Sequence, residues 1–139
     1  MNVRLTKDQK IEIGSPDDIY SIMQQILLRE SRTGREKEHF WVIGLATSNK
    51  ISYIELVSLG SISETIINPL EVFHLAVRKK SPHIILVHNH PSGNLEPSPT
   101  DKNITKNIVA GGDTLAINVL DHLIISEEFY YSFAQNNLL

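Results

Sequence analysis

The sequence predicts a single mixed α/β (α+β) domain in which helices flank a mixed central β-sheet. Three observations lead to this prediction. Helical and strand-like segments follow one another in the order helix, hairpin, helix, strand, helix and further strands. The chain has 139 residues, the usual length of one domain, and shows no internal repeat, low-complexity tract or linker. It contains no cysteine, so disulfides and thiolate metal sites are excluded.

The N-terminal segment predicts two short strands and a helix. Residues 3–5 and 11–13 have the composition of short edge strands. Ser15 is suited to the N-cap of a helix, a proline follows it at the first helical position, and apolar side chains then recur at helical spacing. We expect this helix to end near residues 30–33, with Gly34 as its stop.

Two apolar segments then predict a β-hairpin. Residues 39–47 are too apolar for a surface strand, which is typical of a strand near the centre of a sheet. Residues 51–59 predict the returning strand, because the polar residues 48–50 between the two segments have the chemistry of a turn. The hairpin supplies the first two strands of the predicted sheet.

A second helix is predicted to begin after Asn68. This asparagine is a good N-cap, a proline follows it, and Glu71 lies three residues further on, as in a capping box. Ser81-Pro82 should end the helix. Its expected apolar face consists of Leu70, Phe73 and Val77.

The rest of the chain predicts a third helix among several strands. Residues 83–87 are a run of apolar side chains typical of a buried strand. A helix is expected from Pro99 to about Ala110, where Gly111-Gly112 would terminate it. The remaining strand-like pieces are residues 116–119, 122–125 and 129–133, with Glu127-Glu128 as a turn between the last two.

The segment from residue 87 to residue 101, V-H-N-H-P-S-G-N-L-E-P-S-P-T-D, carries the strongest chemical signal. His88 and His90 are two residues apart at the end of a strand, so their side chains should point to the same face. A proline and a glycine then break the strand, and Asp101 follows at the start of the third helix. Two imidazoles and a carboxylate, with a fourth position open, are typical of a catalytic zinc site.

Ser98 and Asp101 also have a simpler interpretation. The tetrapeptide S-P-T-D is a capping box in its own right, with Ser98 as the N-cap and Asp101 as the third helical residue. The two interpretations are compatible, because the helix start would fix Ser98 while Asp101 turns its carboxylate to the metal. The histidines at positions 39, 74, 83 and 122 are expected to be packing or surface residues, and Asp121 is expected to be structural.

The composition and the charge of the chain disfavour several classes of protein. Lys and Arg number 13 against 16 Asp and Glu, and this net charge of −3 does not favour a nucleic-acid binder. The N-terminus has no apolar core typical of a signal peptide, and no apolar run approaches the ~20 residues that a membrane span needs. We therefore expect a cytoplasmic protein that does not contact membranes and binds nucleic acid weakly or not at all.

The motif resembles the metal signature of the JAMM (JAB/MPN) metallopeptidases. In that signature two histidines, one residue apart, are followed at fixed spacing by a serine and an aspartate, in this chain Ser98 and Asp101. The strings L-V-H-N-H-P-S-G, P-S-x-x-D and, at residues 121–125, D-H-L-I-I resemble the RadC branch in particular. The resemblance covers roughly Glu38 to Leu138. One departure is Pro69-Leu70-Glu71, where many relatives have P-R-E.

The resemblance implies a JAB/MPN-type domain with one zinc ion per chain at a strand end and a helix start. The implied ligands are His88, His90 and Asp101, with a water in the fourth place. Glu38 is implied as the general base, and Ser98 as the residue that helps to hold the tetrahedral intermediate. Residues 1–37 would then be an N-terminal strand and helix segment, too short for the helix-hairpin-helix region usual in RadC-type proteins, and residues 38–138 the metal-binding core.

The implied reaction is hydrolysis of a peptide or isopeptide bond in a protein or peptide substrate. Two alternatives stay open: a DNA repair or recombination factor acting on or near nucleic acid, and a metal-stabilised interaction module without catalysis. Glu96, in the loop between the metal ligands, competes with Glu38 for the role of base. A carboxylate on a mobile loop is the poorer base, because a base must stay within hydrogen-bond reach of the water. The sequence does not indicate the oligomeric state.

Overall fold

A five-stranded sheet is built around the central strand β3 (His83–Asn89). On one side β3 pairs antiparallel with β1 (His39–Leu45), and on the other it pairs parallel with β4 (Asn118–Ile125). The structure is a computed structural model that describes residues 1–139. Because β3 lies at the centre of the sheet and helices pack on both faces, its side chains are buried along most of its length.

The edges of the sheet are β2 (Ile51–Leu59) and β5 (Tyr130–Ser132), so the strand order is β2-β1-β3-β4-β5. β1 and β2 form the predicted hairpin, and β4 and β5 are also antiparallel. The parallel pair β3 and β4 needs a crossover connection, which α4 (Pro99–Leu115) supplies. The sheet is therefore mixed, and the predicted α/β fold is confirmed.

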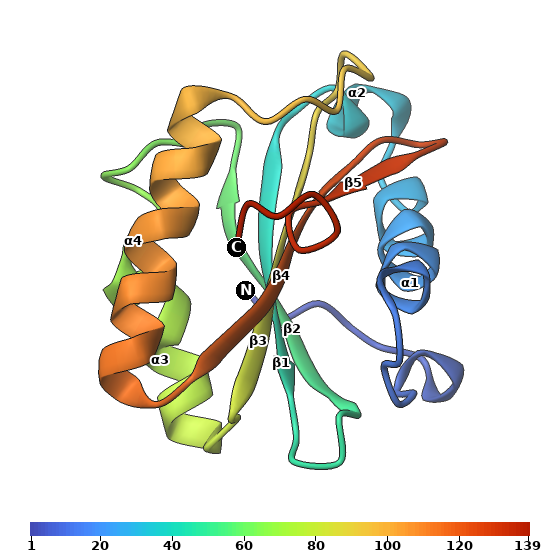
Figure 1. Cartoon of the computed structure of the whole chain (residues 1–139). Coiled ribbons are helices and arrows are strands. Elements are labelled where there is room, and N and C mark those ends of the chain that lie inside the picture. Colours follow the sequence, from blue (N-terminus) through green and yellow to red (C-terminus); the bar gives the residue numbers. More distant parts are fainter.

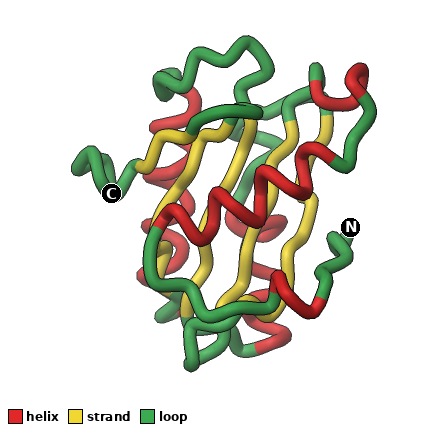
Figure 2. Tube along the Cα trace, turned by 90° about the vertical axis from the view of Figure 1, so that its right-hand side faces the viewer, coloured by secondary structure: helices red, strands yellow, loops and turns green.

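Helices cover both faces of the sheet (Figure 1). α1 (Pro16–Leu28) lies on one face, and in Figure 2 it crosses in front of the strands. α3 (Pro69–Lys79) and α4 pack together on the other face. A 3-10 turn, Lys7–Gln9, precedes α1, and the short helix α2 (Arg32–Arg35) connects α1 to β1.

The core has two halves, one on each face of the sheet. The half beneath α1 is made of residues 19, 22, 23, 26 and 27 from the helix and residues 41, 43, 45, 51, 54, 85, 87, 123 and 125 from the sheet and its hairpin. The half beneath α3 and α4 includes Phe40, Val42, Tyr53, Val72, Phe73, Ile84, Leu86, Ile104 and Ile108. Successive residues of a strand point to opposite faces, so residues 84, 86 and 88 all face α3 and α4.

The N-terminal segment differs from the prediction. Residues 3–5 and 11–13 form no strands; only isolated bridges join Asn2 to Glu55 and Glu12 to Lys50. The 3-10 turn between the two pieces leads the chain away from the sheet edge, so neither piece extends into a ladder. α1 ends at Leu28, earlier than expected, and Gly34 lies inside the separate helix α2. That second helix forms because Ser31 caps it by accepting from the Gly34 N–H.

The predicted apolar face of α3 is also partly wrong. Phe73 is buried, but Leu70 and Val77 are 77% and 53% exposed. The face that packs on the sheet is instead Val72, Phe73, Leu75 and Ala76. Asn68 caps the helix as expected, by accepting from the Glu71 N–H, although the reciprocal bond of a capping box is not formed.

The two glycines of α4 do not end the helix. α4 continues through both of them to Leu115, and residues 116–119 and 122–125 belong to a turn and one continuous strand, β4, rather than to two strands. The helix ends at Ala116, which adopts the left-handed conformation with φ 59°. Gly112 is needed for a close approach, because a Cβ there would lie 2.4 Å from the backbone oxygen of Ile117.

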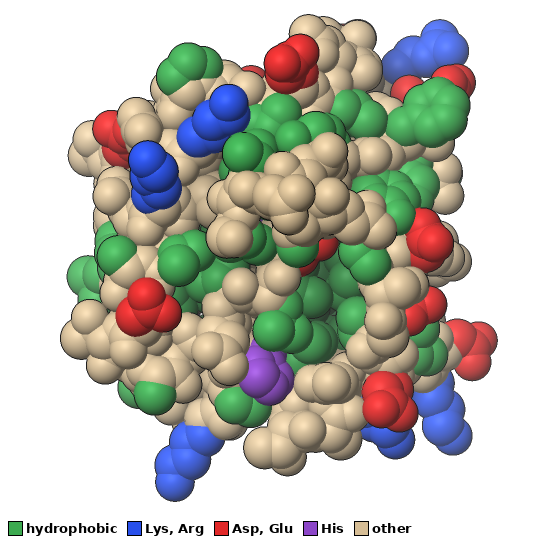
Figure 3. Space-filling view, viewed as in Figure 1, with side chains coloured by type: hydrophobic (Ala, Val, Ile, Leu, Met, Phe, Trp, Pro, Cys, Tyr) green, Lys and Arg blue, Asp and Glu red, His purple; other side chains and the backbone are tan.

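Charged side chains of both signs are scattered over the face shown in Figure 3. Its Lys and Arg side chains are spread among acidic ones and form no large patch. None of the helices combines the length and the apolar character required to cross a bilayer.

The glycine pair gives a stability prediction. Gly112→Ala should lower the free energy of unfolding by about 1–3 kcal/mol, because the new methyl group meets a backbone atom that cannot move aside. Gly111→Ala should lower the free energy of unfolding clearly less. The atoms nearest to a Cβ at Gly111, at 3.2 Å and beyond, are side-chain carbons of Phe73 and Pro69. The higher helix propensity of alanine, worth ~1 kcal/mol, also offsets that cost. Urea unfolding of both variants checks this, and equal losses would contradict it.

Candidate metal centre

Two histidines extend from the central strand toward the start of α4. His88 lies within β3, paired with Phe40 on β1 and Ile124 on β4, and its side chain is fully buried. His90 follows the strand, and its backbone N–H continues the ladder by donating to Ile125 O over 3.0 Å. Both side chains therefore point to the α4 face, as the predicted spacing requires.

Asp101 completes the cluster from the first turn of α4. Its Oδ1 lies 3.2 Å from His88 Nε2, and its Oδ2 lies 3.2 Å from His90 Nε2. The two Nε2 atoms are 3.0 Å apart. One candidate ligand atom from each residue lies within 4.8 Å of the others. The structure thus brings together the three residues that the sequence predicted to be metal ligands.

The capping box and the metal cluster coexist, as expected. Ser98 Oγ accepts from the Asp101 N–H over 3.0 Å, and Asp101 Oδ2 accepts from the Ser98 N–H over 2.8 Å. This pair of bonds fixes the carboxylate of Asp101 at the helix start while both of its oxygens face the histidines. Ser98 uses its oxygen as an acceptor for the helix, which leaves its own hydrogen for a group in the cleft.

The spacing of the donor atoms fits a small divalent ion. Ligands held about 2.0–2.2 Å from a tetrahedral zinc ion lie roughly 3.3–3.6 Å from one another. The distances of 3.0–3.2 Å between the three residues lie just below that range. His90 Nδ1 lies 2.6 Å from the carbonyl oxygen of Asn94, which can only accept, so Nδ1 carries a hydrogen and Nε2 is left for a metal. Two imidazoles and a carboxylate can therefore bind one metal ion.

The electrostatics of the cluster favour a negative carboxylate beside the rings. Burial alone would raise the pKa of Asp101, but hydrogen bonds to His88 and His90, the charge of His88 and the Ser98 N–H together hold that pKa far below its usual value of 3.8. Burial opposes a charged ring at His90. The hydrogen bonds to Asp101 and Asn94 and the charges of Asp101 and Glu38 outweigh it and raise the pKa of His90 above 6.5. The surroundings of Asp101 thus favour the ionised carboxylate, which is the form that can bind a metal ion.

A cleft of about 770 Å³ opens beside the cluster. Glu38 and Ser98, the two predicted catalytic residues, both line it together with His90 and Asp101. Glu38 is half-buried at the entry to β1, and its carbonyl oxygen accepts from the Gly60 N–H over 2.7 Å. Glu96, the competing carboxylate, lines the same cleft from the loop. Both glutamates therefore remain candidates by position, and Glu38 is the one anchored at a strand end.

Asn89, between the two histidines, has a function that its sequence position did not reveal. Its side chain is buried on the opposite face of β3, where Oδ1 accepts from the His39 N–H over 2.6 Å and Nδ2 donates to Lys37 O over 3.1 Å. These two partners flank Glu38 in the chain. Asn89 therefore fixes the backbone on both sides of the candidate base.

His122 and Thr105 are two further residues of the site that the sequence did not predict. His122 was expected to be a packing or surface residue; it is fully buried, and its Nε2 lies 2.7 Å from His88 Nδ1. Thr105 Oγ1 lies 2.6 Å from His122 Nδ1. Burial, together with the nearby charge of His88, lowers the pKa of His122 well below its ordinary value of 6.5. The one feature of the sequence that could have indicated this contact is that Thr105 lies one helical turn after Asp101, on the same face of the predicted helix.

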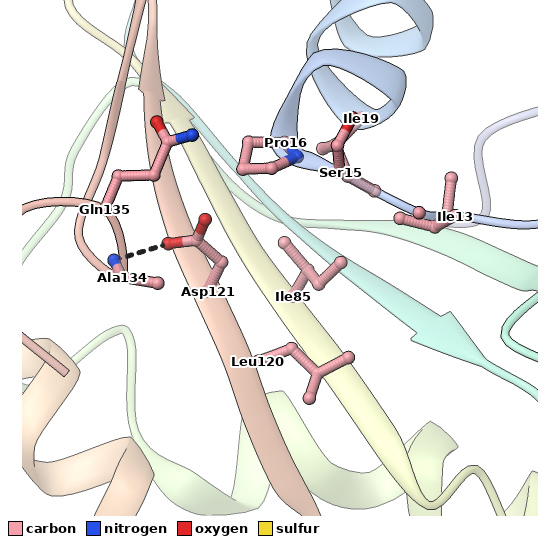
Figure 4. Close-up of a pocket in the computed structure, with 10 residues that line it drawn as sticks. Ile13, Ser15, Pro16, Ile19, Ile85, Leu120, Asp121, Ala134 and Gln135 are labelled. Carbon is pink, nitrogen blue, oxygen red and sulfur yellow. Dashed lines mark hydrogen bonds between the residues drawn. The ribbon is translucent and has the colours of Figure 1, made fainter.

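A second cavity, of about 360 Å³, lies on the other side of the sheet between α1, β4 and the C-terminal segment (Figure 4). Its one charged side chain, Asp121, is structural, as expected. The carboxylate accepts from the backbone N–H groups of His122 and Ala134 and from Ser132 Oγ. All of these bonds lie within the fold, so the carboxylate ties β4 to the segment that follows β5.

The family model for the RadC-like JAB domain matches residues 13–138 of this sequence. The chain belongs to the RadC-like JAB domain family. The resemblance drawn from the histidine motif and the mixed α/β fold of the JAB domain are thereby confirmed.

Similar proteins carry the name UPF0758 protein. The relative from Alkaliphilus metalliredigens is 42% identical over 127 residues, which are 91% of this chain and 53% of that protein. The relative from Chlorobaculum parvum is 38% identical over 137 residues, which are 99% of this chain and 60% of that protein. The relative from Caldanaerobacter subterraneus is 41% identical over 136 residues, covering 92% of this chain and 56% of that protein. This RadC-like JAB domain thus spans little more than half the length of these relatives.

The metal centre gives a direct prediction. The purified chain should bind about one zinc ion, and His88→Ala or His90→Ala should weaken binding by more than the ~10–100-fold typical of changes outside the ligand set. His74→Ala is the matched control, because His74 lies on α3 and pairs with Glu55, away from the cluster. Elemental analysis and titration against a chelating dye measure the effect. Full occupancy in both ligand variants would show that the two histidines do not hold the metal.

Proposed function

We propose that this RadC-like JAB domain is a zinc-dependent hydrolase that cleaves a peptide or isopeptide bond. The observation that carries the proposal is the cluster of His88, His90 and Asp101 at the wall of a cleft that also contains a strand-end carboxylate, Glu38. A site with three protein ligands and one open position is typical of catalytic rather than structural zinc. A non-catalytic metal module would have no need of the adjoining cleft and carboxylate.

Each residue of the cleft has a distinct task in this proposal. His88, His90 and Asp101 would hold a zinc ion, which would supply the Lewis acidity that lowers the pKa of a bound water toward ~7. Glu38 accepts a proton from the attacking water and later returns it to the leaving amine. The Ser98 hydroxyl donates its free hydrogen to the oxygen of the tetrahedral carbon centre. Asp101 and the two histidines hold the metal and take no proton.

The charge of the cleft favours a peptide over a nucleic acid. Its acidic lining residues are Glu36, Glu38, Glu96 and Asp101, whereas Lys37 is its only lysine or arginine. Such a surface repels phosphate groups, and it accommodates neutral or lysine-bearing segments. A peptide with basic residues, or an isopeptide on a lysine side chain, is therefore the substrate class that we favour. Nothing in the cleft favours the alternative of a factor that acts on nucleic acid.

The base assignment is tested by three matched glutamate variants. Glu38→Gln should keep the fold and the zinc while losing turnover by a factor on the order of 10²–10⁴, because the amide cannot accept the proton. Glu36→Gln is the control, since Glu36 lines the same cleft but is two residues from the base. Zinc content and cleavage of a library of basic peptides and lysine isopeptides are measured together. If Glu96→Gln were the inactive, zinc-loaded variant instead, the base would be Glu96.

Nucleic-acid binding is tested separately. With a net charge of −3 and acidic side chains around the cleft, the chain should bind duplex DNA only weakly at physiological salt. A fluorescence anisotropy titration over a range of salt concentrations measures this. Tight binding that weakens steeply with added salt would point to the nucleic-acid alternative.

A further inference from the structure

A chain of buried hydrogen bonds joins two of the metal ligands behind the site. It begins at the His88 ring, passes through His122 and Thr105, and ends at the backbone carbonyl of Asp101. Every member is buried: His88 and His122 are 0% exposed, and Thr105 is 2% exposed. No water competes for these bonds, so each hydrogen must be donated within the chain.

The direction of these bonds follows from the last acceptor. Thr105 Oγ1 lies 2.9 Å from Asp101 O, and a carbonyl oxygen can only accept, so the single hydroxyl hydrogen points there. His122 Nδ1, 2.6 Å from the same hydroxyl, must then be the donor. The His122 ring is fully buried between two phenylalanines and contacts no carboxylate, so it holds a single hydrogen. With that hydrogen on Nδ1, its Nε2 accepts from His88 Nδ1 over 2.7 Å.

The direction of these bonds determines whether His88 Nε2 is free to bind a metal. A neutral His88 with its hydrogen on Nδ1 has a bare Nε2, and that is the atom 3.2 Å from Asp101 Oδ1 and 3.0 Å from His90 Nε2. The reverse direction requires Thr105 to turn its hydrogen from the Asp101 carbonyl to His122. His122 would then donate from Nε2 to His88 Nδ1, and the hydrogen of His88 would lie on Nε2, pointing at the position of the metal.

We propose that Thr105 and His122 are positioning residues that hold His88 in the tautomer whose Nε2 is ready to bind the metal. This inference rests on the metal centre of the proposed function, but not on any hydrolytic activity. Hydrogen bonds from outside the ligand set commonly fix the tautomer and the ring orientation of a metal-binding histidine. In this chain the ligand Asp101 supplies the final acceptor, so the two ligands are coupled through the core.

The His122 ring is also fixed mechanically. It stacks on Phe133 with ring centres 4.5 Å apart and meets Phe40 edge-on at 5.7 Å. The Phe133 N–H donates to the His122 carbonyl over 3.0 Å. Asp121 accepts from the N–H of His122 and from that of Ala134, as the dashed line in Figure 4 shows for Ala134. The ring is therefore held between two aromatic side chains on an anchored strand.

Thr105→Val and Thr105→Ser separate the hydroxyl from the shape of the side chain. Valine leaves the His122 Nδ1 hydrogen without an acceptor, which favours the reversed tautomers and should weaken zinc binding about 10- to 100-fold. Serine keeps the hydroxyl and should bind zinc as the wild type does. Thr114→Val is a control in the same helix, because its exposed hydroxyl bonds only to Ala110 O. Titration of each variant against a chelating dye gives the zinc affinities.

Nitrogen-15 NMR of the histidine rings supplies a readout that a purely structural role would not move. In the wild type, with and without zinc, the hydrogen between His88 and His122 should reside on His88 Nδ1, with scalar coupling across the bond to His122 Nε2. In Thr105→Val it should move to His122. A hydrogen on His88 Nε2 in the zinc-free wild type, or equal zinc affinities for the valine and serine variants, would overturn the proposal.

The outcomes also separate this inference from the proposed function. If the wild-type chain binds zinc and shows the expected tautomers but cleaves no peptide or isopeptide, the proposed hydrolase function is contradicted. The positioning role of Thr105 and His122 is then retained. A wild-type chain that binds no zinc removes the metal centre, and with it the positioning role of Thr105 and His122.

Discussion

The position of β3 at the centre of the sheet is the constraint on which the site depends. A central strand of a sheet that helices cover on both faces has buried side chains on both sides, so His88 is placed in the core. A buried imidazole must place its hydrogen and its lone pair on partners. Its Nε2 faces Asp101 and His90, the other two candidate metal ligands, and its Nδ1 faces His122. The parallel pairing of β3 with β4 is what brings His122 there.

The start of α4 serves two purposes with one set of atoms. Asp101 caps the backbone N–H of Ser98 and faces both histidines, so helix formation and assembly of the metal cluster require the same carboxylate orientation. The low pKa of Asp101 serves both purposes, because each of them requires the ionised carboxylate. The folded state favours its ionised form, and above the ordinary carboxyl pKa the same charge both stabilises the fold and prepares the ligand.

Local signals were sufficient to predict that the three candidate metal ligands lie together, and insufficient to predict the residues behind them. Period-two alternation and a capping box, both visible within fifteen letters of sequence, place His88, His90 and Asp101. His122 meets His88 across 34 positions of sequence and Thr105 meets His122 across 17, so both contacts depend on the crossover through α4. The Gly111-Gly112 pair was misjudged for a similar reason. The close approach that requires Gly112 is to Ile117 O, which is set by how the chain leaves the helix.

The three residues His88, Asn89 and His90 show how one strand end organises the whole site. The outer two point to the α4 face and reach the metal position, while Asn89 points to the opposite face and bonds to the backbone on both sides of Glu38. The alternation that separates the ligands by two residues therefore also gives the middle residue access to the start of β1. In this arrangement the distance between the metal position and the carboxylate is set by the pairing of β1 with β3, not by a flexible loop. Such a rigid frame would suit the role of base proposed for Glu38, because a base must stay within reach of one water molecule.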